Sequence, residues 1–148
     1  MVSYNYGAQN HPELTSLLRK SRILIGICGL LLCAASMLAA PAIASTFIGS
    51  GHAHLHDLST HATRIYMLCF LLSGFNLFAS AWFTALGNGK ISVVVAMVRT
   101  LVLELGCVFL LPLLIGIDGI WAAIAVAEVF AFILSTTLIQ IYRKKYGY

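Results

Sequence analysis

The sequence predicts an all-α, polytopic membrane protein with four transmembrane helices. Of its 148 residues, 60% are hydrophobic and only 9% are charged, whereas soluble domains average about 25% charged residues. Residues 23–51 and 65–89 contain no Asp, Glu, Lys or Arg, and two further apolar runs follow them. Because about 20 apolar residues suffice for a helix to cross the hydrocarbon core of a bilayer, each run is long enough to span a membrane.

The apolar runs, and the polar or glycine-containing segments between them, indicate the expected helices and turns. We expect a loop at 1–21, helices at about 22–48, 64–86, 91–117 and 120–142, and a basic tail at 143–148. Pro41 is expected to kink the first helix. A polar loop, Gly49–Thr63, is expected after it. Gly87–Lys90 and Asp118-Gly119 read as tight turns, in which glycine tolerates positive φ.

The basic residues indicate how the helices are oriented. Cytoplasmic flanks of membrane helices are rich in Lys and Arg. With four spans, one side of the membrane receives Arg19, Lys20, Arg22, Lys90, Arg143, Lys144 and Lys145. The opposite side receives only Arg64 among the basic residues. The loop at 1–21 and the tail at 143–148 are therefore expected in the cytoplasm. Since the net charge of +4 comes from helix ends, it indicates contact with membrane lipid and no nucleic acid partner.

Three ionisable residues fall within the expected spans: Arg99, Glu104 and Glu128. Each costs about 2.5–3.5 kcal/mol in mid-membrane on insertion scales, so each needs a partner or water. The two-residue turn between the last two helices makes Arg99 and Glu128 candidates for a structural ion pair. Arg99 and Glu104 are five residues apart, about 140° around an α-helix, so we expect them on different faces. The alternatives are a proton or cation relay through Glu104 or Glu128, and an Arg99 that extends towards the headgroups.

The second expected helix carries a polar stripe formed by Ser73, Asn76, Ser80 and Thr84, which fall on one face at helical spacing. Such a stripe makes hydrogen bonds to a neighbouring helix or lines a water-filled cavity.

Sequence motifs for catalysis or metal binding are missing from this chain. His52, His54, His56, Asp57 and His61 have spacing at which imidazoles bind zinc or copper, but no Cys or Glu joins them, so we expect a solvated loop and no metal site. The four cysteines form no C-x-x-C pair. The phosphate loop, the nucleophile elbow and the dinucleotide fingerprint are also absent. We therefore expect neither an enzyme nor a cofactor.

Three stretches resemble a known family, the multidrug and toxic compound extrusion (MATE) transporters. They are VSYNYGAQNHPEL at Val2–Leu14, FNLFASAWFTALGNGKIS at Phe75–Ser92 and LPLLIGIDGIWAAIAVAE at Leu111–Glu128. The resemblance implies that the four helices are the ninth to twelfth of twelve, in the C-terminal lobe. The polar stretch directly after Met1 is typical of a loop entered from an earlier helix, so we expect a piece of something longer.

This resemblance also implies a function. Family members sit in the plasma membrane and export cationic or amphipathic compounds in exchange for Na⁺ or H⁺, so the implied partner is an N-terminal lobe absent from this chain, and the fragment alone is expected to be inactive. Some members hold a cation-binding carboxylate where this chain has Asn76, an amide that cannot titrate. The pathway candidates are Asn76, Ser80, Thr84, Glu104 and Glu128. The alternative is a self-standing four-helix membrane protein with a structural, assembly or regulatory role.

Overall fold

A computed structural model describes residues 1–48 and 52–148, and all regular structure in these residues is helical. A short helix, α1 (Val2–Gly7), precedes four long ones. The first is α2 (His11–Phe47), the second joins α3 (Ala53–Met67) to α4 (Phe70–Ala85), the third joins α5 (Gly89–Met97), a π-helix η1 (Val98–Glu104) and α6 (Leu105–Ile115), and the fourth is α7 (Ile117–Tyr146). Each of the four is long and apolar enough to cross a membrane. The predicted all-α architecture with four candidate membrane helices is confirmed.

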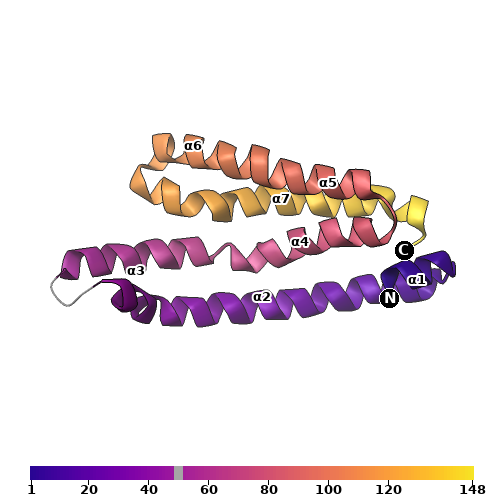
Figure 1. Cartoon of the computed structure of the whole chain (residues 1–148), viewed down its shortest axis with the longest axis horizontal. Coiled ribbons are helices and arrows are strands. Elements are labelled where there is room, and N and C mark those ends of the chain that lie inside the picture. Colours follow the sequence, from indigo (N-terminus) through magenta and orange to yellow (C-terminus); the bar gives the residue numbers. More distant parts are fainter. Residues whose placement is uncertain (49–51) are drawn as a thin grey trace.

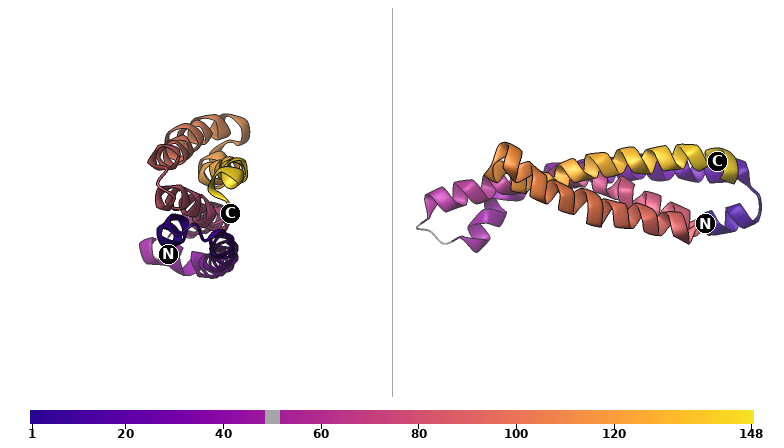
Figure 2. Two further views of the ribbon diagram at one scale, coloured as in Figure 1. Left: turned by 90° about the vertical axis from the view of Figure 1, so that its right-hand side faces the viewer. Right: turned by 90° about the horizontal axis from the view of Figure 1, so that it is seen from above.

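The four spans run side by side along the long axis of the molecule, and both termini lie at the same end (Figure 1). The span made of α3 and α4 lies between α2 and α7 and contacts both of them. The third span packs along α7, and its first part, α5, also contacts α4 (Figure 2). In this arrangement α4 and α7 each contact more than one other span, so side chains from different spans meet along these two helices.

The first long helix begins well before the expected Arg22. Asn10 caps α2, because its side chain accepts a hydrogen bond from the backbone N–H of Glu13 at 3.3 Å. Pro12 occupies the first turn, where a missing N–H costs nothing. The expected loop at 1–21 is therefore wrong as secondary structure, since α1 and the start of α2 fill most of it. The Asn10 cap and Pro12 mark the start of a helix more reliably than the polarity of the segment marks a loop.

The expected polar loop Gly49–Thr63 is also mostly helical. Residues 53–63 belong to α3, whereas 49–51 lie outside the described residues. The segment 53–63 contains no Gly or Pro to break a helix. One side of α3 packs against α2 and α7, and His56 Nε2 lies 3.2 Å from the carbonyl oxygen of Pro41. The C-terminal end of α2, beyond Pro41, turns away from the main helix axis (Figure 2).

Two glycines with positive φ make the turns between the later spans. Gly87 has φ 77°, and the N–H groups of Gly87 and Asn88 bond back to the carbonyls of Thr84 and Phe83, which closes α4 as a Schellman motif. The next turn falls at Gly116, with φ 67°, and α7 begins at Ile117. The turn expected at Asp118-Gly119 is thus placed too late.

A stripe of small residues on α7 sets how closely the neighbouring spans approach. Ala123, Ala127, Ala131 and Ser135 are buried and recur every four residues, so they share one face of the helix. Gly119 extends this stripe, and a Cβ atom there would lie 2.5 Å from the backbone of Leu111. Small residues let helices approach closely without side chains between them. Side chains larger than these fit at the interface only at particular positions, and Glu128 lies at one of them.

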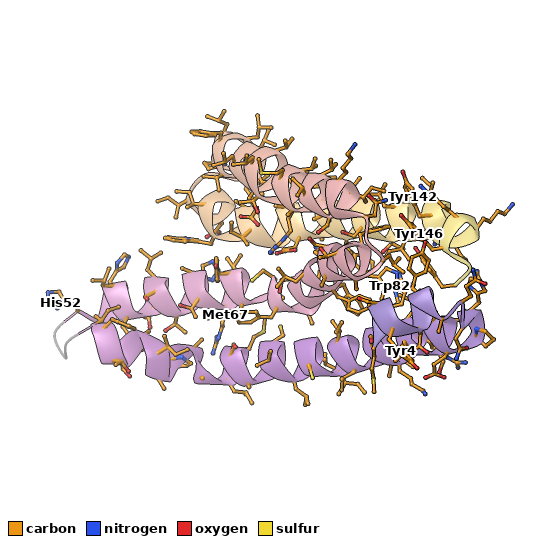
Figure 3. All side chains as sticks on the ribbon, turned by 45° about the vertical axis from the view of Figure 1, so that its right-hand side comes forward. Tyr4, His52, Met67, Trp82, Tyr142 and Tyr146 are labelled. Carbon is orange, nitrogen blue, oxygen red and sulfur yellow. The ribbon has the colours of Figure 1, made fainter. Side chains whose placement is uncertain are left out.

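An aromatic cluster closes the end of the bundle at which the termini lie (Figure 3). Trp82 of α4 is 1% exposed and packs edge-on against Tyr148, with ring centroids 5.4 Å apart. The expected tail at 143–148 is mostly the last turn of α7, which ends at Tyr146, with Gly147 as a left-handed cap. Its basic side chains lie where they interact favourably with the negative end of the helix dipole.

Candidate functional site: an ionisable cluster inside the bundle

Glu128 is the most deeply buried charged residue among those described, with 1% of its surface exposed. Arg99, from η1, reaches its carboxylate with two nitrogens. The Nη2–Oε1 distance is 2.5 Å and the Nε–Oε1 distance is 3.1 Å. The structure therefore brings together the two residues that the sequence analysis pairs. A two-point contact of this kind holds the guanidinium and the carboxylate in one relative orientation.

Asn76 of α4 meets the same carboxylate from a third span. Its side-chain Nδ2 donates to Glu128 Oε2 at 2.5 Å and to the backbone carbonyl of Glu128 at 3.0 Å. Asn76 is 1% exposed, and its Oδ1 has no hydrogen-bond partner among the described residues. A buried amide oxygen without a partner is unusual, since more than about 90% of buried polar groups are paired. Amide oxygens are also ligands for hard cations.

The position of Glu104 corrects the sequence analysis. Glu104 Oε1 lies 3.7 Å from Arg99 Nε, so these two residues share a face of their helix. The expectation that they point in different directions assumes an α-helix, but Val98–Glu104 is a π-helix. Its i→i+5 hydrogen bonds bring residues five apart nearly above one another. No composition signal in this apolar run predicts the wider helix.

The ionised cluster carries more negative than positive charge. Arg99 contributes one positive charge, whereas Glu104 and Glu128 contribute two negative ones, and the described residues add no further ion pair to this group. Glu128 has partners at both oxygens, while Glu104 has the one long contact and a side chain that is 23% exposed. Within this cluster, Glu104 is therefore the carboxylate better placed to exchange a proton or bind a cation.

Ser80 and Thr84, from the same stripe as Asn76, belong to a separate and uncharged cluster. Both approach Ser92 of α5, with Oγ–Oγ and Oγ1–Oγ distances of 2.8 Å and 2.7 Å. Ser92 was missed in the sequence analysis. A signal for it exists, because Thr84 and Ser92 lie four residues on either side of Asn88, and a tight turn places such residues side by side. These hydroxyls join two neighbouring spans.

The histidine-rich segment forms pairs at the opposite end of the molecule. His61 Nε2 lies 3.1 Å from Asp118 Oδ1, which links α3 to the start of α7, and His56 lies near Asp57. Within residues 1–48 and 52–148 no group of three or more His, Cys, Asp or Glu side chains forms a possible metal site.

Comparisons with known proteins agree with this architecture. A model of the MatE family matches residues 1–110. The chain belongs to the MatE family. A search of curated proteins gave no significant match. Among solved structures, an outward-facing multidrug resistance MATE family transporter of the MOP superfamily aligns over 98% of the chain, with a TM-score of 0.88 and 23% identity.

A second solved structure shows an inward-facing MATE family transporter described in the same words. It aligns over 97% of the chain with a TM-score of 0.81 and 25% identity. The chain covers 33% and 34% of these two structures, so it spans about one third of their length. The chain is therefore a multi-pass membrane protein whose fold is that of part of a MATE transporter. The MATE family consists of transporters rather than enzymes.

Proposed function

We propose that this chain is the C-terminal part of a multidrug efflux antiporter in the plasma membrane, and that it works only together with an N-terminal lobe. The observation that supports this most is the match of nearly the whole chain to about a third of a multidrug transporter. Placement in the C-terminal lobe rests on the three sequence stretches that resemble the last helices of the family. The exported compounds are cationic or amphipathic, and the exchanged ion is Na⁺ or H⁺.

The ionisable cluster suggests how this lobe takes part in transport. Arg99 and Glu128 fix the third span against α7, while Asn76 fixes α4 against the same carboxylate. Glu104 supplies the excess negative charge, which favours a cation or a proton at this depth in the membrane. We assign the exchangeable position to Glu104, with the unpartnered Asn76 Oδ1 as an additional oxygen, and a structural role to the hydroxyls of Ser80 and Thr84.

Dye efflux tests the proposal. Cells without their own efflux pumps would express either residues 1–148 alone or a chimera in which these residues replace the matching third of a MATE transporter. Ethidium should leave cells that carry the chimera and stay in cells that carry the fragment alone. Efflux from the fragment alone at the rate of the chimera would contradict the need for a second lobe. An inactive but membrane-inserted chimera would contradict the transport role and favour the self-standing alternative.

The coupling ion needs a separate measurement. Vesicles that contain the chimera would be given either a Na⁺ gradient or a pH gradient, and dye movement would be followed under each. Glu104→Gln should reduce gradient-driven transport at least about tenfold, because within the described cluster Glu104 is the carboxylate with fewer partners than Glu128. Lys144→Gln, at the end of α7 and outside the cluster, is the control. Equal rates in the Glu104→Gln and Lys144→Gln variants would exclude Glu104 as the exchange site.

A further inference from the structure

A basic pocket lies at the end of the bundle that holds both termini. It has a volume of about 410 Å³ and is formed by residues of α2, residues of α7 and Tyr148. Three arginines line it: Arg19 and Arg22 from α2, and Arg143 from α7. Among the described residues, no Asp or Glu side chain lies within ion-pair distance of any of the three. The pocket therefore concentrates positive charge that no Asp or Glu side chain of the described residues neutralises.

The arginines lie at the expected level of the lipid headgroups. Arg22 is the last charged residue before the uncharged stretch 23–51, and Arg143 is the first after the apolar run at 120–142. The floor of the pocket is apolar, since Leu18, Ile23 and Ile139 also line it. On α2 the apolar face continues from Ile23 through Ile27 and Leu30, three exposed side chains that share one side of the helix. An acyl chain would lie along this face.

Tyr148 orients one of the three arginines, and its phenol adds no negative charge to the pocket. Arg143 uses its Nε to donate to the main-chain oxygen of Tyr148 at 2.8 Å, an oxygen that belongs to the terminal carboxylate in a chain of residues 1–148. This contact orients the guanidinium, offsets part of its charge and leaves the two Nη groups as donors. Tyr148 is 4% exposed, and its hydroxyl donates to the carbonyl of Ile139. Burial raises the pKa of Tyr148 to about 12, so its phenol stays neutral at physiological pH.

We propose that this pocket binds the phosphate of an anionic phospholipid headgroup, with Arg19, Arg22 and Arg143 as its ligands and the acyl chains along α2. Arginine suits this task because its planar fork of donors matches the geometry of phosphate oxygens. Basic pockets between membrane helices bind such headgroups in other proteins. A bound lipid would join the ends of α2 and α7, which are separated in sequence by two other spans.

Native mass spectrometry of the purified chain, residues 1–148, tests the site without any transport assay. The protein would be equilibrated with equal amounts of phosphatidylglycerol and phosphatidylcholine of the same acyl chains. We expect it to retain phosphatidylglycerol preferentially. The double variant Arg19→Gln/Arg22→Gln should lose this preference about tenfold. The control Lys20→Gln/Lys144→Gln also removes two positive charges, one from α2 and one from the end of α7, but outside the pocket lining, and should keep the preference.

Two further arms separate the alternatives. Arg19→Lys/Arg22→Lys keeps the charge but not the bidentate fork, so it should bind with intermediate preference, and it replaces the Gln variant if that one does not fold. Inorganic phosphate at millimolar concentration should not displace the lipid. If Arg19→Gln/Arg22→Gln and the control Lys20→Gln/Lys144→Gln lose the preference for phosphatidylglycerol equally, the specific site is overturned. The lipid would then be attracted by the overall positive charge of this end of the protein. Displacement by phosphate alone would overturn the lipid as ligand. Equal retention of phosphatidylglycerol and phosphatidylcholine by the unaltered chain would overturn the proposal. An acidic protein segment would then be the better candidate ligand for the pocket.

Discussion

The two polar clusters along α4 differ in charge, in reach and in how completely their hydrogen bonds are made. The ionisable cluster joins Asn76, Arg99 and Glu128 from three spans, and one buried oxygen in it has no partner among residues 1–48 and 52–148. The hydroxyl cluster joins Ser80, Thr84 and Ser92 across a single tight turn, and each hydroxyl has a partner. Neutral hydroxyls stabilise an interface that the chain connectivity already favours. Charged groups, which are costly to bury alone, instead specify which distant helices must meet.

The largest effect is expected from Glu128. Glu128→Gln leaves the Arg99 guanidinium without its closest counter-charge in a site that is nearly closed to solvent. We expect a loss of about 3 kcal/mol in the free energy of unfolding, as when one partner of a buried pair is removed. Glu104→Gln is the matched comparison, because Glu104 contacts the same guanidinium at 3.7 Å and is partly exposed. It should cost only about 0.5 kcal/mol. Thermal or denaturant unfolding in detergent micelles measures both.

A double-mutant cycle sharpens the same comparison. Arg99→Gln in the Glu128→Gln background removes the second charge as well and should recover part of the lost stability, since two amides can bond to each other. Additive losses in the double variant would show that the two residues do not act as a pair.

An intermediate effect is expected from Asn76. Asn76→Leu removes the donor to Glu128 Oε2 and also the unpartnered Oδ1, so loss and gain partly cancel. We expect a destabilisation of about 1 kcal/mol. Asn76→Asp should destabilise more, because it places a second carboxylate against Glu128, and its cost should fall as the pH is lowered and one of the two takes up a proton. A cost for Asn76→Asp that does not change with pH would contradict this contact.

The smallest effect is expected from the hydroxyl cluster. Thr84→Val removes a hydrogen bond to Ser92 and should cost about 0.6 kcal/mol, the average for hydrogen bonds between membrane helices. Thr137→Val is the control, since the Thr137 hydroxyl bonds to the carbonyl of Ile133 in its own helix. The free energies of unfolding of the two variants should differ by roughly that amount. Identical curves would show that the contact between α4 and α5 contributes no net stability.

Apolar run length predicted the four spans, and a single chemical requirement predicted the Arg99–Glu128 ion pair. A charge in hydrocarbon needs a counter-charge, and Glu128 was within reach of Arg99 on the next helix. The helix ends were predicted less well. Polarity suggested loops at 1–21 and 49–63. The Asn10 cap produces helix from His11 onward, and the packing of α3 against α2 and α7 produces helix at 53–63.

The sequence by itself determined that this chain spans a membrane and which side chains cannot face lipid, because burial in hydrocarbon has a cost that depends on residue type. The tertiary structure decided the partners that the sequence did not predict, such as Glu128 for Asn76 and Arg99 for Glu104. The π-helix turned Glu104 towards Arg99, since i→i+5 bonding changes the angle between residues five apart. The gathering of Arg19, Arg22 and Arg143 around one pocket likewise depends on where the tertiary structure places α2 relative to α7, which no local pattern encodes.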